Sequence, residues 1–405
     1  MNVMKDDILL PIPSDQDASG RQFGDEEIEF LTQVIRSGTL TSTKGTFVKS
    51  LQTAFGALLG TEHCYACGSG TGAIHAAIAA VDPEPGDEII TSPITDMGAI
   101  TPIIYQTAVP VFADVDPITG NVTAAAIERM IGPKTRAIIV THLFGNPADM
   151  GPIMELANRH GIPVIEDCAQ AYGATYDGKP IGTVGAIGCF SLQQGKHITT
   201  GEGGLVVTND DHFGRRLRLF IDKAWGYGDP KPDHYFAALN GRMTELQGAV
   251  ALAQLGKLAH SVSQRQKMAE RLTGMISGMP GLKLIDAPAA GTQSFWKYGF
   301  HVTEGYGGPV ALAQALRERE IASAPRYINK PAFECEVIRD QRTFGNSRFP
   351  FNLARKEVLD YAPENYRGTY AFLRSVLVLA WNEKLEEGHV DLIANQIAAH
   401  VESVA

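Results

Sequence analysis

One lysine in this sequence stands where its amine could attack a carbonyl group. Lys196 lies in the segment FSLQQGKHITTGEGG, residues 190–204, whose other residues are mostly small or uncharged. Glycines let the backbone approach a bound group closely, and an amine removed from water loses its proton more easily and can form a Schiff base. Taken alone, the segment favours a surface lysine in a glycine-rich turn, because short motifs often match by chance. The rest of the chain must decide.

A glycine-rich turn between an apolar strand and an alanine-rich helix could bind an anion. It lies in CYACGSGTGAIHAAIAA, residues 64–80. The unpaired amides and the dipole at a helix start favour a phosphate at about Gly70 to Gly72, where Thr71 adds a hydroxyl donor. The segment is neither a Walker loop nor a full dinucleotide fingerprint. A tight turn that binds nothing is the alternative left open.

Polar residues at the ends of predicted strands are the remaining candidates for chemistry. Asp96, His142, Asp167 and Gln170 follow apolar segments, and ligands of open α/β sheets bind at the carboxyl ends of the strands. Asp167 ends the strand PVIED, so its carboxylate could hold the protonated ring nitrogen of a pyridine cofactor. Capping of the following turn is the alternative for this aspartate.

Alternating strands and helices must position these residues. The strands EIITSP, VPVFADV, RAIIVTHLFG and PVIEDCAQA alternate with helical segments, which predicts an α/β fold with a mostly parallel sheet sandwiched by helices. A chain of 405 residues exceeds one usual core. We therefore expect a large domain at 1–260, a smaller C-terminal α/β domain at 261–405, and a long helix from about residue 242 linking them.

Composition excludes several classes of protein. The hydrophobic content is 44%, and no apolar run is long enough to cross a bilayer. A net charge of -10 argues against nucleic-acid binding. The N-terminus lacks the pattern of a secretory signal, which favours the cytoplasm. Five scattered cysteines indicate reduced thiols, and the Cys64–Cys67 pair lacks the second pair of a zinc site, so we expect no metal.

Six segments together resemble a single family. They are GSGTGAIHAA, VFADVDP, THLFGNPADM, VIEDCAQAYGA, SLQQGKHITTGEGG and NGRMTELQGAVALAQL. Their order and spacing over roughly residues 25–260 are similar to those of the DegT/DnrJ/EryC1/StrS family, and six matches in order are far more specific than one. The resemblance implies a fold-type-I, pyridoxal-phosphate-dependent aminotransferase that acts on keto-sugars or cyclitols.

The resemblance also implies a role for three of the candidate residues. Lys196 matches the lysine that holds the cofactor as an internal aldimine and later moves protons. Asp167 matches the aspartate that pairs with the pyridine nitrogen and keeps it protonated, so that the ring can accept electrons. Gln170 falls where the family has a histidine or glutamine beside the cofactor.

The phosphate of the cofactor has its own implied partners. Gly70, Thr71 and Ser191 match the family's phosphate cradle, in agreement with the helix-start argument. Asn240 matches an asparagine that, in the family, reaches the phosphate from the neighbouring subunit. The resemblance therefore implies a homodimer with shared active sites.

The sequence departs from the family pattern at two positions. The family usually places an aromatic residue on the cofactor ring after a Pro-x-x-Thr turn, but SPITDMGAI has Asp96 there and Met97 next. We expect Asp96 to cap the following helix while still lying against the ring, and Met97 could supply a soft apolar contact. Gly241 stands where the family commonly has an aromatic residue.

Transamination is the function that this resemblance implies. Glutamate or glutamine would donate the amino group, and a keto-sugar, nucleotide-linked, or a cyclitol ketone would accept it. One alternative is a sugar dehydratase on the same fold, although such relatives replace the lysine with histidine, and His197 is only a neighbour of Lys196. The other alternative is a non-catalytic regulator that binds the cofactor. Residues 226–240, 296–301 and 326–329 are candidates for selecting the substrate.

Overall fold

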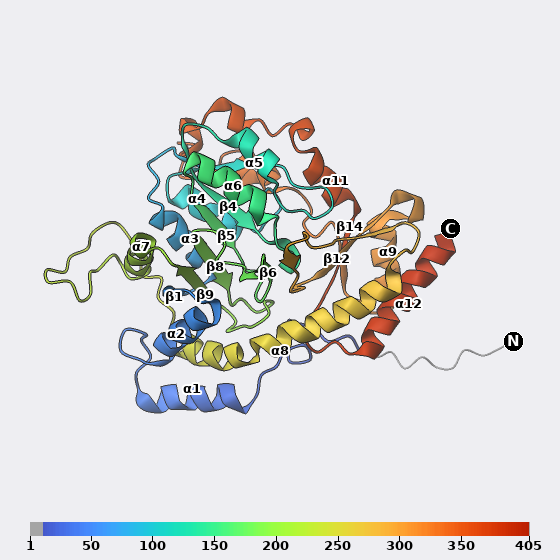
Figure 1. Ribbon diagram of the computed structural model, residues 1–405, viewed down its shortest axis with the longest axis horizontal. Coiled ribbons are helices and arrows are strands. Elements are labelled where there is room, and N and C mark those ends of the chain that lie inside the picture. The colour runs from blue at the N-terminus through green and yellow to red at the C-terminus, as the bar shows by residue number, and fades with distance from the viewer. Residues whose placement is uncertain (1–10, 405) are drawn as a thin grey trace.

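The computed structural model describes residues 11–404, and one long helix connects its two main sheets (Figure 1). The larger sheet has seven strands in the order β1-β9-β8-β5-β4-β2-β3. These strands are β1 (His63–Cys67), β2 (Glu88–Thr91), β3 (Val109–Phe112), β4 (Thr135–Thr141), β5 (Val164–Asp167), β8 (Ile187–Ser191) and β9 (Gly204–Thr208).

The larger sheet is mostly parallel, as predicted. Strands β3, β2, β4, β5 and β8 pair in parallel, whereas β9 runs antiparallel to both β8 and β1. Most strands are buried on both faces and rich in Val and Ile, which is typical of a sheet covered by helices. Since the parallel strands point the same way, the carboxyl ends of β5 and β8 lie together at one edge.

Helices cover both faces of this sheet. They are α2 (Phe47–Leu59), α3 (Gly70–Ala80), α4 (Thr101–Tyr105), α5 (Ala124–Met130), α6 (Met150–His160) and α7 (Asp211–Ile221). Helix α1 (Asp25–Ser37) packs instead against the long helix α8 (Glu245–Ile276). Apolar residues of α3 and α7 share one core with the sheet, and those of α2, α5 and α6 share the other. Alternation along β4 explains this division, because Ile138 and Val140 face one core while Ala137 and Ile139 face the other.

A smaller antiparallel sheet follows, in the order β10-β12-β14-β13. Its strands are β10 (Leu282–Leu284), β12 (Tyr298–Val302), β13 (Ser323–Pro325) and β14 (Val376–Leu379), and helices α9 (Gly308–Arg317) and α12 (Glu387–Val404) share their core. Helices α10 (Glu336–Arg339) and α11 (Arg367–Ser375) contribute buried residues to the core of the larger sheet. A third, three-stranded sheet joins β6 (Thr175–Tyr176), β7 (Lys179–Pro180) and β11 (Gly291–Thr292).

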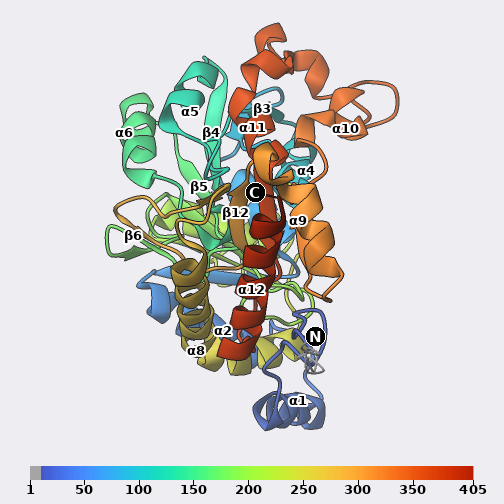
Figure 2. The same ribbon diagram turned by 90° about the vertical axis from the view of Figure 1, so that its right-hand side faces the viewer.

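Helix α8 (Glu245–Ile276) is the predicted link between these parts (Figures 1 and 2). Its first half carries Ala251 and Leu258 into the core of the larger sheet, and its second half carries Met268 and Leu272 into the core of the smaller one. The helix runs without a break through residue 260, so the predicted domain boundary at that residue stays a prediction.

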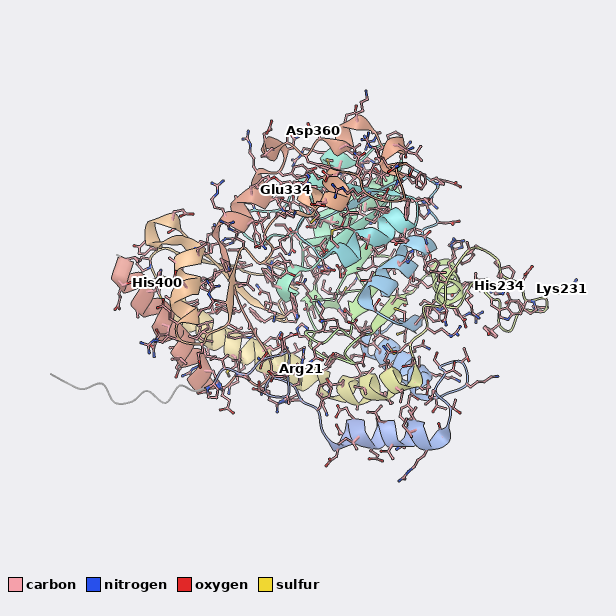
Figure 3. All side chains as sticks on the ribbon, turned by 180° about the vertical axis from the view of Figure 1, so that it is seen from behind. Arg21, Lys231, His234, Glu334, Asp360 and His400 are labelled. Carbon is pink, nitrogen blue, oxygen red and sulfur yellow. The ribbon has the colours of Figure 1, made fainter. Side chains whose placement is uncertain are left out.

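Two of the stretches that are candidates for selecting the substrate differ in structure. Strand β12 begins only at Tyr298, because Phe295 has a φ of 50° that strand pairing does not accommodate. Residues 226–240 form a loop that extends away from the body, with Lys231 and His234 near its tip (Figure 3). Within residues 11–404, none of the helices combines the length and apolar character that a bilayer crossing requires.

Candidate active site

Lys196 lies in the connection between β8 and β9, at the carboxyl end of β8. Two backbone hydrogen bonds join the two ends of this connection. Leu192 N donates to Gly203 O at 2.8 Å, and Gln194 N donates to Gly201 O at 2.9 Å. The Lys196 amide itself donates to Gln193 O at 3.0 Å. The lysine loop, residues 192–201, is therefore a folded turn that carries Lys196 near its middle.

A cavity of about 390 Å³ opens beside this loop. Seven of the eight residues that the sequence predicted for the site line it, namely Gly70, Thr71, Asp96, Asp167, Gln170, Ser191 and Lys196. They come from four separate segments, so only the fold brings them together. Asn240 does not line the cavity; it is exposed and bridges Asp222 at the base of the extended loop.

The Lys196 amine is tuned by its surroundings. Burial lowers its pKa to about 8, since the surrounding protein disfavours the charged form; the carboxylates of Asp167 and Asp96 oppose this shift, and the nearby Lys297 ammonium adds to it. The amine lies 4.3 Å from the centre of the Trp296 ring. An amine with this pKa is substantially deprotonated just above neutral pH, which a nucleophile or proton carrier requires.

Asp167 is the last residue of β5 and is buried. One of its carboxylate oxygens accepts a hydrogen bond from Ala169 N at 3.2 Å, and the other accepts one from the Thr141 hydroxyl at 3.4 Å. Burial raises its pKa, against the opposing effects of the Ala169 amide and the Lys196 charge. The predicted cap is therefore present, and the same side chain still faces the cavity, where a cation would offset the cost of burying its charge.

The start of α3 forms the floor that the sequence assigned to a phosphate. The Ser69 hydroxyl caps the helix by accepting from Gly72 N at 3.0 Å, while the amides of Gly70 and Thr71 precede the first intrahelical bond. A Cβ at Gly70 would come within 2.6 Å of the Ser191 Cβ, so a larger residue there would displace Ser191. The close approach of these two elements places the Ser191 hydroxyl beside the helix start, where the unpaired amides favour an anion.

Asp96 caps the short helix that follows it, as expected. Its carboxylate accepts from Gly98 N at 2.7 Å at the start of a single 3-10 turn, residues 97–99. The side chain is exposed and lines the cavity. Met97 instead packs against the core of the larger sheet and is not part of the cavity wall. The soft contact that the sequence suggested for Met97 is therefore not formed by this cavity.

Trp296 and Tyr327 line the cavity from the smaller part of the chain. The sequence placed these two residues only within the candidate stretches 296–301 and 326–329. The backbone near them has positive φ angles, of 50° at Phe295, 70° at Arg326 and 56° at Tyr327, and no periodic pattern of apolar residues predicts such turns. The two rings meet edge to face with centroids 6.3 Å apart.

The hydrogen bonds of Gln170 determine whether the Tyr327 hydroxyl can donate a proton to a bound molecule. Phe144 N donates to Gln170 Oε1 at 2.7 Å, which fixes the orientation of the amide. Gln170 Nε2 must then donate to the Tyr327 hydroxyl oxygen, at 3.2 Å. None of the residues described accepts the Tyr327 hydroxyl proton, so this proton is available to a molecule in the cavity.

Two histidines near the site point elsewhere. His142 is buried against Glu166, with Nε2 3.1 Å from the carboxylate, and its Nδ1 accepts from Ala148 N. His197 is also buried, hydrogen-bonds Ser294 O at 3.0 Å, and has a pKa well below its usual value because of that burial. Neither His142 nor His197 lines the cavity, so neither side chain can take part in chemistry there.

Comparisons with known proteins identify the family of the chain and agree with its fold. The model of the DegT/DnrJ/EryC1/StrS aminotransferase family matches residues 21–355. The chain is 38% identical to GDP-perosamine synthase of Caulobacter vibrioides, over 66% of this chain and 72% of that protein. It is 34% identical to L-glutamine:2-deoxy-scyllo-inosose aminotransferase of Streptomyces kanamyceticus, over 68% of this chain and 67% of that protein.

A solved structure extends the likeness to the whole chain. The aminotransferase from Psychrobacter cryohalolentis superposes with a TM-score of 0.84 at 26% identity, covering 95% of this chain and 98% of that one. The predicted fold class is thereby confirmed, including the C-terminal part, where the sequence segments gave no specific match. The chain is an aminotransferase and belongs to the DegT/DnrJ/EryC1/StrS family.

Proposed function

We propose that this enzyme binds pyridoxal phosphate and transfers an amino group from glutamate or glutamine to a keto-sugar or a cyclitol ketone. The single observation that carries the proposal is the arrangement of the cavity. A lysine with a pKa of about 8, a buried carboxylate and an unpaired helix start line one space. These three groups complement the aldehyde, the ring nitrogen and the phosphate of pyridoxal phosphate.

Each residue has a defined task in this proposal. When bound, pyridoxal phosphate supplies an electron sink for charge that develops on the substrate carbon. Lys196 would hold the aldehyde carbon of the cofactor, and as a free amine it would carry a proton between carbon atoms. Asp167 holds a proton on the ring nitrogen. The amides of Gly70 and Thr71, together with the Ser191 hydroxyl, bind the phosphate.

The acceptor is the less determined part of the proposal. One relative is named for a nucleotide-linked sugar and the other for a cyclitol ketone, and we propose a ring ketone of one of these two classes. Tyr327 would donate its uncommitted proton to an oxygen of the acceptor, and Trp296 would pack against the acceptor's apolar edge. Asp96 would accept from an acceptor hydroxyl while lying beside the cofactor ring.

We further propose a cytoplasmic homodimer. Asn240 is exposed at the end of the extended loop and does not line the cavity of its own chain. A partner subunit could therefore receive it beside the phosphate, and the dimer would complete each site. Five free cysteines are compatible with a reducing compartment.

A half-reaction screen tests the proposed function. Purified protein mixed with pyridoxal phosphate should acquire the absorbance band of lysine-bound cofactor, and L-glutamate or L-glutamine should bleach it. The amine-loaded protein is then offered 2-deoxy-scyllo-inosose and nucleotide-linked keto-sugars, and recovery of the band identifies the acceptor class. Product mass distinguishes the dehydratase alternative, which loses water instead of gaining an amine. Protein that stays colourless with added cofactor would refute the proposal.

Cofactor loading should depend on pH with a midpoint near 8, the pKa of Lys196. The attacking form is the free amine, so below this pH the loading rate should fall about tenfold per pH unit, and above it the rate should level off. Stopped-flow growth of the band from about pH 6.5 to about 9.5 measures this. Asp96→Asn should move the midpoint down, because the Asp96 carboxylate raises this pKa. A rate that is flat over the range would contradict the prediction.

A further inference from the structure

Four consecutive carbonyls of the lysine loop each accept a hydrogen bond from a side chain of a distant segment. Arg21 Nη2 donates to Gln194 O, Trp296 Nε1 donates to Gly195 O at 2.6 Å, and Arg21 Nη1 donates to Lys196 O at 2.6 Å. Ser261 of α8 donates to His197 O at 3.2 Å. The donors come from the N-terminal segment, the turn before β12, and α8.

This pattern follows from the shape of the loop. Residues 195–197 lie beyond the bond from Gln194 N to Gly201 O, and no backbone amide of the described residues donates to the carbonyls of residues 194–197. Gly195 and His197 are buried. A buried carbonyl without a donor destabilises the folded state by about the free energy of one lost hydrogen bond. Side chains from elsewhere must therefore complete the backbone of this turn.

Arg21 supplies two of the four donors and is itself only 4% exposed. Its planar guanidinium reaches the carbonyls at 194 and 196 with two different nitrogens, and its Nε donates to Asp15 O at 2.9 Å. A fork of this kind fixes the spacing of the two carbonyls, which a lysine amine could not do. In Figure 3 Arg21 lies beside α8, and the carbonyl of the next residue, Gln22 O, accepts from Gln254 of that helix at 3.0 Å.

The charge of Arg21 is compensated on its far side. Glu383 lies 3.6 Å from Arg21 Nη1 and 2.8 Å from Arg265 Nη2, so one buried carboxylate serves two arginines. Arg265 in turn donates to Trp296 O at 3.1 Å. Asp15 pairs with Lys297 at 2.7 Å. The residues that hold the loop are thus themselves held by ion pairs from α8 and from the segment after β14.

We propose that Arg21 is a positioning residue that fixes the backbone on both sides of Lys196 and so aims the lysine amine into the cavity. The inference rests on the proposed function in one respect, namely that Lys196 is the reacting amine. It assigns a role to residues 11–24, for which the sequence offered none. It also makes the geometry of Lys196 depend on a segment about 175 residues away.

The test compares Arg21→Ala, Arg21→Lys and the unchanged enzyme. Both variants should slow bleaching of the lysine-bound cofactor band by donor, by about 10- to 100-fold, because a small misplacement of a reacting group has effects of this size. Arg21→Lys keeps the positive charge but loses the fork, so it should resemble Arg21→Ala. Added guanidinium ion should restore part of the rate to Arg21→Ala.

A second measurement needs no cofactor. In the full chain, amide hydrogen exchange of peptides from residues 192–201 should be about 10-fold faster in Arg21→Ala than in the unchanged protein, because two carbonyl partners are lost. Arg355→Ala is the matched control. Arg355 also pairs with a buried carboxylate, Glu88, at 2.7 Å and donates to a carbonyl, Met130 O, at 3.1 Å, but it lies outside the cavity.

The outcomes separate the proposals. Arg355→Ala should lower the thermal midpoint without changing exchange in the lysine loop or bleaching by donor. If the Arg21 variants behave as Arg355→Ala does, Arg21 is structural only and the inference is overturned. If the unchanged protein never acquires the cofactor band, the proposed function fails, while the exchange experiment still decides whether Arg21 holds the loop.

Discussion

Replacing Lys196 with alanine is expected to abolish the lysine-bound cofactor band and to slow amino transfer by about 10⁴-fold. The substitution removes both the nucleophile that binds the aldehyde and the base that moves the proton. Lys196 is the lysine among the cavity-lining residues described, and its amine is partly neutral near physiological pH. No other described lining side chain can take over both tasks.

Borohydride reduction and peptide mapping give the direct measurement. After reduction of the cofactor-loaded enzyme and digestion, the cofactor mass should be found on the peptide that contains Lys196. Lys297→Ala is the matched control, because Lys297 also lies near Trp296, 5.2 Å from its ring, but pairs with Asp15. This control should keep the band. A band that survives Lys196→Ala and disappears in Lys297→Ala would show that Lys297 binds the cofactor, and our proposal would be wrong.

Asp167→Asn is expected to reduce amino transfer by about 10²- to 10³-fold while leaving the fold intact. Asparagine has the same shape and can still accept from Ala169 N, so the turn after β5 keeps its cap. It carries no negative charge, however, and cannot hold a proton on the ring nitrogen of the cofactor. The loss should therefore appear in the rate of proton transfer and far less in the thermal midpoint.

Single-turnover bleaching by donor, measured alongside equilibrium binding of pyridoxal phosphate, checks this expectation. Asp96→Asn is the control from the same cavity, since asparagine also caps helices well and Gly98 N keeps its acceptor. We expect that variant to retain most of its donor half-reaction. Equal losses in the two variants would mean that general negative charge in the cavity matters, and that Asp167 has no special role at the ring nitrogen.

The sequence by itself determined the class of fold and named seven of the residues that line the cavity. Alternation of buried Val- and Ile-rich strands with helices requires a covered parallel sheet, and the polar residues at strand ends must then meet at one edge. This local logic made Lys196, Asp167 and the Gly70–Thr71 turn candidates with alternatives left open, and the resemblance of six segments to one family then implied their roles. Each is marked by nearby residues, because strand ends, helix starts and glycine turns are encoded within a few positions.

The tertiary structure alone decided how Lys196 is held and what faces it. Arg21, Trp296 and Ser261 donate to the lysine loop from three remote segments, and Tyr327 reaches Gln170 from the turn after β13. No periodic pattern in the sequence predicts such partners, because a buried carbonyl can accept a hydrogen bond from any donor that the fold brings within reach. Backbone angles at Phe295 and Tyr327 that side chains seldom adopt exist only because packing imposes them.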